Sequence, residues 1–275
     1  MLPPLALYSF IVLIPFGDGV WISLHNWDGA SPMQFVGLHN FVSSFTDPLV
    51  RQAFFHSLVI IAFYSVIPVG LGLVLASVLA RVRLRLLAMW RAILFLPQVI
   101  SVVVVGVAWQ WVLAQDGPLN DFLRLIGLGR LTQVWLGSFT WALPTEGVIG
   151  TWLMSGLCMV LFVTGAQSID PELYDAADVD GAGPVREFFT VTLPGLRNVT
   201  AVASILTLVG ALNNFGLIWV TTQGGPGTQT QVMSTLIYTR AFVLDDIGDA
   251  AALAVLLAIL IMGMSIGISR WAERS

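Results

Sequence analysis

Residues 53–85 read AFFHSLVIIAFYSVIPVGLGLVLASVLA followed by RVRLR, so a long apolar run ends in three arginines, Arg81, Arg83 and Arg85. A helix needs about 20 apolar residues to cross a bilayer core of roughly 30 Å. Arginine in short loops concentrates on the cytoplasmic side of a membrane. This stretch therefore predicts a transmembrane helix that ends at the cytoplasmic surface.

Five further apolar runs of similar length lie on either side of this one. They cover residues 5–24, 88–113, 146–166, 199–222 and 250–269. Together with residues 53–80 they predict an all-α, polytopic membrane protein with six transmembrane helices. We interpret residues 5–24 as a retained helix and not a signal peptide, because no basic segment precedes them. Asp18 is expected near the outer end of this helix or facing other helices.

The composition excludes several classes of protein. The chain of 275 residues is 57% hydrophobic and 10% charged, whereas a soluble domain carries roughly 25% charged residues. A soluble globular enzyme and a disordered tail are thereby excluded. The net charge is −4, so the chain lacks the excess of basic residues that a nucleic-acid-binding protein needs. The single cysteine, Cys158, excludes a disulfide framework within the chain and a multi-cysteine metal site.

The arginines predict the orientation. A cytoplasmic N-terminus places eight of the twelve inside, namely Arg81, Arg83, Arg85, Arg91, Arg186, Arg197, Arg270 and Arg274. Arg51, Arg124, Arg130 and Arg240 then lie outside. We divide the chain into residues 1–52, an N-terminal transmembrane helix with an outer loop, and residues 53–275, a core domain. The core domain contains one long cytoplasmic loop, residues 167–198.

The sequence of this loop predicts two short helices. Asp170 is a good N-cap, Pro171 fits the first helical position and Glu172 complements the helix dipole. Gly181 and Gly183 are expected to stop the first helix. A second helix is expected to open at Pro184 and to end at Leu193-Pro194. The loop alone is equally consistent with a helical hairpin on the membrane surface that has no partner.

The loop also resembles the "EAA" signature of permease subunits of bacterial ABC importers. The signature reads E-A-A, then a glycine, then I-x-L-P, and here it is matched by Asp175-Ala-Ala177, Gly181 and residues 191–194, VTLP. Asp175 replaces the usual Glu, and Val191 the usual Ile. The stretches FVGLHNF (35–41), WRAILFLP (90–97) and NFGLIWVTTQGGP (214–226) resemble the maltose-type, carbohydrate branch of this family.

The resemblance implies the type I ABC importer permease fold in the bacterial inner membrane. It implies a second permease, two cytoplasmic ATPase subunits and an extracytoplasmic substrate-binding protein as partners. The residues that match the ATPase-docking segment are Tyr174, Asp175, Ala176, Ala177 and Gly181. The implied substrate is a di- or oligosaccharide, and another solute such as glycerol phosphate is the alternative.

ATP and Mg²⁺ are expected on the partner ATPase subunits and no cofactor on this chain, which is expected not to be an enzyme. The chain has no lysine and therefore no phosphate-binding G-x-x-x-x-G-K-[ST] loop. An ATP-independent secondary transporter would require mid-span carboxylates or broken helices, and neither is apparent in the sequence.

Polar and aromatic residues in the fourth and fifth runs are candidates for the substrate pathway, because polar groups in spans usually face the interior of the bundle. These runs offer Trp152, Met154, Ser155, Thr207, Asn213 and Asn214. The resemblance assigns Leu153, Met154, Thr207 and Ala211 to the sugar cavity. The alternative is that the asparagines join helices and that Trp152 is packing. Met154 and Ala211 offer no hydrogen bond, so the chain is expected to leave much of the sugar contact to the second permease.

Two groups of residues near or within the last apolar run are expected to have structural roles. Asp245, Asp246 and Asp249 near the last span are expected in a solvated loop. Gly263 and Gly267 form a G-x-x-x-G pattern, which favours a closely packed helix face over a nucleophile motif.

Overall fold

The computed structural model describes residues 2–81 and 87–273. Among these residues, five helical segments are long and apolar enough to cross a membrane. They are Pro3–Ser23, Pro48–Ser77, Ala142–Ala166, Arg197–Thr221 and Ile247–Glu273. Five of the six predicted runs are therefore confirmed as long apolar helices.

Three of these segments divide into labelled elements, whereas α9 (Ala142–Ala166) and the last segment are continuous. The first joins α1 (Leu2–Tyr8) and α2 (Ile14–Ser23) through a π-helical turn, η1 (Ser9–Leu13). The second joins α4 (Pro48–Ile61) and α5 (Ile67–Arg81) through the π-helical turn η2 (Ala62–Val66). The last is α16 (Ile247–Glu273), preceded by the short helix α15 (Met233–Phe242).

Two predicted spans are interrupted. The run 88–113 forms α6 (Leu87–Val99) and α7 (Val102–Val112), with Pro97 inside α6 shortly before the break. Proline removes a backbone donor and crowds the preceding turn, so a break near it is expected. The fifth span consists of α13 (Arg197–Leu212) and α14 (Gly216–Thr221), separated by residues 213–215. Because neither α6 nor α7 has the length of a span, the count of six remains a prediction.

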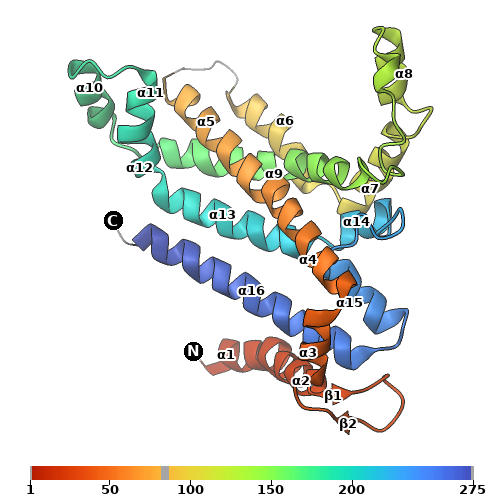
Figure 1. Cartoon of the computed structure of the whole chain (residues 1–275). Helices are drawn as coiled ribbons and strands as arrows, with labels where there is room; N and C mark the ends of the chain where they lie inside the picture. The colour runs from red at the N-terminus through yellow and green to blue at the C-terminus, as the bar shows by residue number, and fades with distance from the viewer. Residues whose placement is uncertain (1, 82–86, 274–275) are drawn as a thin grey trace.

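The two ends of the molecule carry different segments (Figure 1). The N-terminus, the C-terminus and the loop that contains α10 (Pro171–Val179) lie at one end. The other end carries α8 (Pro118–Leu125) with the 3₁₀ turn η3 (Gly129–Leu131). It also carries the hairpin of β1 (His25–Asn26) and β2 (Gln34–Phe35), followed in the chain by α3 (His39–Thr46). This arrangement fits the predicted orientation. Residues 82–86, with two of the three arginines that end the run, lie outside the described residues.

The long helices enclose two apolar clusters. The larger includes Tyr64, Ile149, Leu208 and Leu217, and the smaller includes Cys158 with Phe162. At Gly150 of α9, a Cβ atom would overlap the ring of Tyr64. Glycine therefore permits close contact between α9 and η2. By contrast, a Cβ on Gly263 or Gly267 would meet no described atom within 4 Å, so the expected close-packed face is not formed within the described chain.

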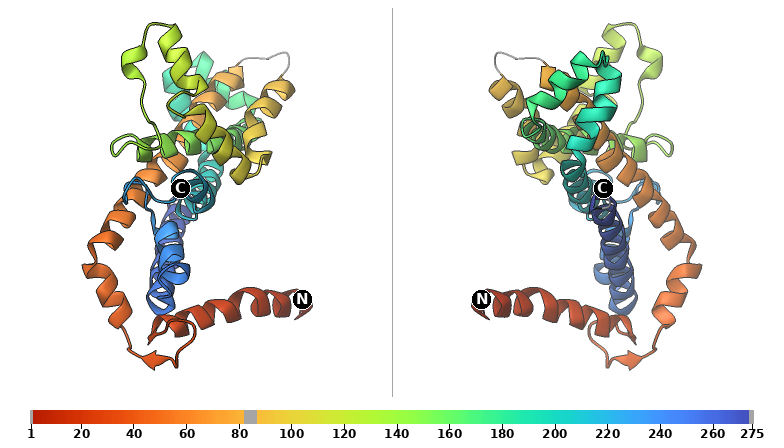
Figure 2. Two further views of the ribbon diagram at one scale, coloured as in Figure 1. Left: turned by 90° about the vertical axis from the view of Figure 1, so that its right-hand side faces the viewer. Right: turned by 90° about the vertical axis from the view of Figure 1, so that its left-hand side faces the viewer.

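The N-terminal helix extends away from the other helices (Figure 2). Its 18-residue apolar window contains no buried residue, and Asp18 is exposed within a turn or two of its outer end. The hairpin that follows pairs His25 of β1 (His25–Asn26) with Phe35 of β2 (Gln34–Phe35). The carbonyl of Trp27 accepts hydrogen bonds from the amides of Ile247 and Gly248 at 3.0 and 3.1 Å. The outer end of the N-terminal segment is thereby fixed to the start of α16.

An arginine joins three elements at the outer end. The guanidinium of Arg240, on α15, forms ion pairs with Asp47, the N-cap of α4, and with Asp249 in the first turn of α16. The expectation of a solvated loop was wrong for Asp249, whose residue is 6% exposed. The physical reason is that Arg240 provides the charge partner that a buried carboxylate requires. Asp245 and Asp246 are exposed, as expected.

Candidate coupling loop and translocation pathway

The first helix of the loop is α10, and its start confirms the prediction. The side chain of Asp170 accepts a hydrogen bond from the amide of Glu172 at 3.0 Å, and Pro171 occupies the first turn. An N-cap of this kind satisfies one of the backbone donors that a helix leaves free. The negative side chain of Glu172 lies in the first turn, where it complements the helix dipole.

The helix ends at Val179 and the chain turns at Gly181. Gly181 has a φ of +69°, a backbone conformation that glycine adopts without strain. The amide of Ala182 donates to the carbonyl of Ala177 at 2.9 Å, which closes the last turn. Residue 181 is therefore constrained by the backbone as well as by any partner.

The second helix of the loop begins at Pro184, as predicted, and ends at Gly195, one residue after the predicted Leu193-Pro194. It comprises α11 (Pro184–Glu187), a π-helical turn η4 (Phe188–Thr192) and α12 (Leu193–Gly195). Pro194 lies near the end of this helix, just after the π-helical turn η4. Its ring nitrogen has no proton to donate to the preceding turn. Only Leu196 separates α12 from the long helix α13.

The loop is attached to the bundle through Tyr174. Its hydroxyl lies 3.3 Å from that of Thr192 in η4. Its ring packs against the smaller apolar cluster, which contains Phe162 of α9 and Leu196. Because Leu196 immediately precedes α13, the attachment connects α10 to two long helices.

The other residues of the predicted docking segment face outward. Asp175, Ala176 and Gly181 are exposed, and Ala177 is partly exposed. Large apolar side chains beside them are also uncovered: Leu173 is 53% exposed and Val179 88%. The loop thus presents small, acidic and apolar side chains at the end of the molecule that holds both termini.

Four of the candidate pathway residues are buried within this chain. Leu153 and Ala211 belong to the larger apolar cluster. The hydroxyl of Thr207 lies 2.7 Å from that of Ser65, and the amide of Asn214 donates to the hydroxyl of Tyr64 at 2.7 Å. Thr207 thus joins α13 to η2, and Asn214 joins the interruption after α13 to η2, which fits the alternative that these polar groups connect helices.

The other candidates are accessible to different degrees. Met154 and Ser155 are partly exposed, and Ser155 donates to the carbonyl of Thr151 in its own helix. Trp152 is 42% exposed and contacts Trp109 edge to face at 5.6 Å. Asn213 is exposed and lies at the interruption between α13 and α14. Of these four residues, Asn213 lines the cavity described next.

A cavity of about 310 Å³ adjoins this interruption. Its lining includes Asn213, Phe215 and Ser234, together with apolar residues of α16. The hydroxyl oxygen of Ser234 is buried and has no hydrogen-bond partner among the described residues. Phe215 stacks on Trp219 at 5.4 Å and lies 4.8 Å from Tyr238. The cavity therefore combines an amide, an unpaired hydroxyl and an aromatic ring.

Phe215, Ser234 and a buried carboxyl group were not predicted from the sequence. Glu146 is fully buried, and one of its oxygens accepts a hydrogen bond from the hydroxyl of Thr221 in α14. Its other oxygen has no partner among the described residues. Gln110 of α7 donates to the carbonyls of Val220 and Thr221, each at 2.9 Å. These contacts fix α14 to α7 and α9.

The fold and this loop are those of the membrane subunit of a transporter. Comparison with known proteins identifies the family of transporter subunits. Residues 68–272 match the family described as "binding-protein-dependent transport system inner membrane component". The chain belongs to this family, whose members are permease subunits of ABC importers. It is a multi-pass membrane protein and a transport subunit, as the sequence predicted.

Several curated relatives match over nearly the whole chain. A probable ABC transporter permease protein of Bacillus subtilis is 35% identical, covering 96% of this chain and 92% of the relative. A diacetylchitobiose uptake system permease protein of Streptomyces coelicolor is 33% identical, covering 93% and 76%. An sn-glycerol-3-phosphate transport system permease protein of Yersinia pseudotuberculosis is 31% identical, covering 100% and 93%.

A solved structure confirms the fold. A chain of a bacterial ABC transporter involved in the import of the acidic polysaccharide alginate superimposes with a TM-score of 0.81 at 22% identity. The match covers 99% of this chain and 93% of that one. The third and fifth predicted spans are therefore broken, contrary to the expectation from the sequence, and the breaks occur within an ABC importer permease fold.

Proposed function

We propose that this chain forms half of the translocation pathway of an ATP-driven importer for a neutral di- or oligosaccharide. A second permease supplies the other half, an extracytoplasmic binding protein delivers the sugar, and two cytoplasmic ATPase subunits supply ATP hydrolysis with Mg²⁺. The observation that carries the proposal is α10, an exposed short helix firmly attached to long spanning helices. The exposed Ala176, Asp175 and Gly181 form its docking surface for an ATPase subunit.

The geometry of the loop supports docking of a groove-bearing partner. Small side chains at Ala176 and Ala177 permit close approach of another backbone, and Leu173 and Val179 remain uncovered. Burying apolar surface stabilises an interface by about 25 cal/mol per Å². The carboxylate of Asp175 is available to pair with an arginine of the ATPase. Such an ion pair is weakened by salt.

The docking test compares two exposed positions of the loop. We expect Ala176→Leu, which preserves a helix-forming residue, to reduce co-purification of the ATPase and substrate-stimulated ATP hydrolysis. Thr190→Leu, on the second helix, is the matched control. Gly181→Val should also uncouple, both by bulk and by backbone strain. Wild-type coupling in Ala176→Leu would exclude docking through this face of α10.

The role of Asp175 is tested separately by salt. Asp175→Ala should weaken association with the ATPase at low ionic strength, and the difference from wild type should shrink as salt is raised. Asp175→Glu, which restores the residue of the family signature, should associate at least as well as wild type. A loss in Asp175→Ala that does not change with salt would argue against an ion pair.

The cavity at the interruption supports the choice of substrate. A sugar needs hydrogen-bonding groups and an aromatic surface, and the exposed Asn213 and the ring of Phe215 provide these. A phosphate ester requires cationic or multiple amide donors, and no arginine lines the described part of this cavity. A neutral sugar is therefore favoured over glycerol phosphate, although one relative is named for that solute.

Uptake measurements distinguish the candidates. Transporter reconstituted in vesicles with its binding protein should take up a labelled disaccharide when ATP is supplied inside. Asn213→Ala should reduce this uptake, whereas Asn198→Ala, at the opposite end of α13, should not. If the vesicles took up glycerol phosphate but no sugar, the proposed substrate would be glycerol phosphate and not a sugar. Uptake without ATP that collapses with an ion gradient would indicate secondary transport.

A further inference from the structure

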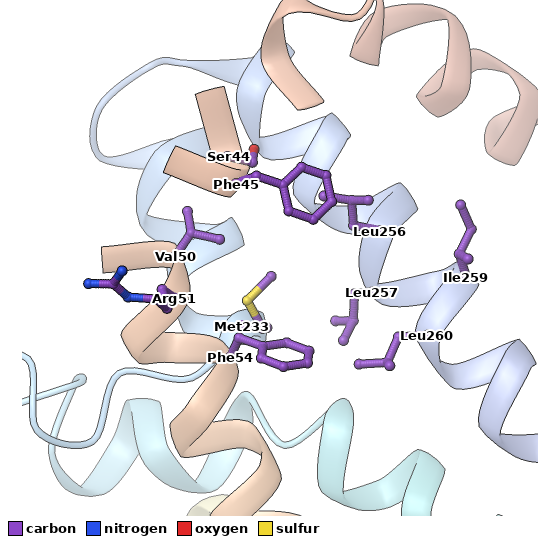
Figure 3. A pocket seen from close by; sticks show the side chains of 10 residues that line it. All are labelled: Ser44, Phe45, Val50, Arg51, Phe54, Met233, Leu256, Leu257, Ile259 and Leu260. Carbon is purple, nitrogen blue, oxygen red and sulfur yellow. The ribbon is translucent and has the colours of Figure 1, made fainter. Parts of the chain in front are cut away.

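A groove lies in the outer half of the molecule between α3, α4 and α16, with α15 at its floor (Figure 3). Its volume is about 400 Å³. We call it the outer groove and define it by Phe45, Arg51, Phe54, Met233, Leu257 and Leu260. It is distinct from the cavity at Asn213, although Leu257 borders both.

The lining is apolar apart from Ser44 and Arg51. The hydroxyl of Ser44 is already used, because it donates to the carbonyl of Asn40 at 2.7 Å. The groove therefore offers few hydrogen bonds to a polar solute inside it. Phe45 is 76% exposed and Phe54 39%, so aromatic side chains at its edge remain uncovered. This chemistry suits a hydrocarbon chain.

Arg51 is the charged residue at the edge of the outer groove. Its guanidinium points away from the apolar interior (Figure 3) and has no ion-pair or hydrogen-bond partner in the described parts of the chain. Two other outer arginines are neutralised: Arg240 pairs with Asp47 and Asp249, and Arg124 with Asp116 and Asp121. Arg51 thus keeps an unpaired positive charge beside an apolar groove.

The depth of the groove matches one acyl chain. Leu256 and Leu260 lie on α16, which starts at Ile247 at the outer end. At about 1.5 Å per residue, they lie roughly 14 to 20 Å below that start. Arg51 lies in the first turn of α4, also at the outer end. The groove therefore runs from the outer surface to about the middle of a bilayer core of roughly 30 Å.

We propose that the outer groove is a binding site for an anionic glycerophospholipid of the outer leaflet. One acyl chain lies along Phe54, Leu257 and Leu260, and the phosphate accepts hydrogen bonds from the guanidinium of Arg51 at the rim. The charge on Arg51 selects an anionic headgroup over a zwitterionic one. The bound lipid bridges α4 and α16 at the end where Arg240 also joins them. This site is independent of the transported solute.

Native mass spectrometry of the purified full chain tests the proposal. After delipidation, the protein is titrated with phosphatidylglycerol and with phosphatidylcholine of the same acyl chains. We expect wild type to retain one phosphatidylglycerol in preference to phosphatidylcholine. Arg51→Gln should lower this preference about fivefold, the effect expected from one arginine near a membrane surface. Arg130→Gln, at an exposed outer arginine away from the groove, should leave it unchanged.

A second variant addresses the groove itself. Leu260→Trp should reduce retention of both lipids by filling the apolar part, while protection of the buried thiol of Cys158 shows that the chain is folded. An unchanged preference in Arg51→Gln would overturn the proposal. So would a photo-cross-linker at Ile259 that, in the assembled transporter, reacts with a protein subunit and not with lipid, because the groove would then be a protein interface.

Discussion

The contact between α9 and η2 gives the sharpest test of the packing. Gly150 faces the ring of Tyr64, which is buried, and a Cβ at residue 150 would overlap ring carbons. Gly263 in α16 is also inside a long helix, but a Cβ there would meet no described atom within 4 Å. Gly150→Ala and Gly263→Ala therefore make the same chemical change in two different environments.

The expected difference in the free energy of unfolding comes from the one respect in which the two substitutions differ. Each replaces a glycine in a helix interior by alanine, which stabilises a helix by about 1 kcal/mol. Only Gly150→Ala adds an overlap, and overpacking of a filled core costs typically about 1–3 kcal/mol. The difference in the free energy of unfolding between the variants should thus be about 1–3 kcal/mol. Gly263→Ala should be at least as stable as wild type.

The chain contains a reporter for this measurement. Cys158 is the single cysteine and is fully buried, so a thiol reagent labels it only when the structure opens. Where opening is in rapid equilibrium, the labelling rate follows the population of the open form. A difference of about 1–3 kcal/mol changes that rate by about 5-fold to 150-fold. Equal protection of Cys158 in the two variants would refute the inference that Tyr64 occupies the space against α9.

Three further predictions concern polar contacts. Asp170→Ala should destabilise α10 by about 1 kcal/mol and speed its proteolysis, whereas Asp170→Asn, which keeps an acceptor, should not. In a double-mutant cycle, Tyr64→Phe and Asn214→Leu should show a coupling energy of about 0.6 kcal/mol, at most about 1.7, as for other hydrogen bonds within membranes. The rate of Cys158 labelling measures this coupling energy, and a value of zero would exclude the hydrogen bond between Tyr64 and Asn214. Burial raises the pKa of Asp47, but hydrogen bonds from the amide of Leu49 and from Arg240 outweigh it and lower that pKa. The ion pair should therefore stabilise the protein above the unfolded pKa, about 3.9, and this stabilisation should be lost as the pH falls through the lower folded pKa. Thermal unfolding followed by tryptophan fluorescence from pH 7 to pH 3 should show the loss in wild type and a smaller one in Arg240→Gln.

The sequence predicts the long helices because their signal is local. Residues 53–80 and 250–269 are apolar for long enough that only a spanning helix satisfies their backbone in a bilayer. The start of α10 is equally local, since Asp170, Pro171 and Glu172 act within one turn. The fold class follows from these signals, and the loop signature leads to the family.

The interruptions and the cavity could not be predicted with the same rules. The apolar content of run 199–222 continues on both sides of residues 213–215, so hydropathy does not detect the break. Pro97 is a signal for the break before α7, but only the structure places it. The cavity brings Asn213 next to Ser234, and the contact of Glu146 with Thr221 joins positions 75 residues apart in the chain. The sequence predicts a solvated loop for Asp249 because Asp245 and Asp246 lie close to it in the chain. The ion pair of Asp249 with Arg240 forms only in the folded structure and leaves no signal in the sequence.

The interruption at Asn213 separates two differently anchored parts of the fifth span, and this separation bears on the proposed coupling. On the inner side, Tyr174 ties α10 to η4, and only Leu196 lies between α12 and α13. Under this proposal, a displacement of α10 by an ATPase subunit would be transmitted along α13, about 24 Å at 1.5 Å per residue, to Asn213 at the edge of the cavity. On the outer side, Gln110 and Glu146 hold α14 to α7 and α9. Because α13 and α14 are fixed to different neighbours, such a movement of the loop would change the cavity at their junction without requiring α14 to follow.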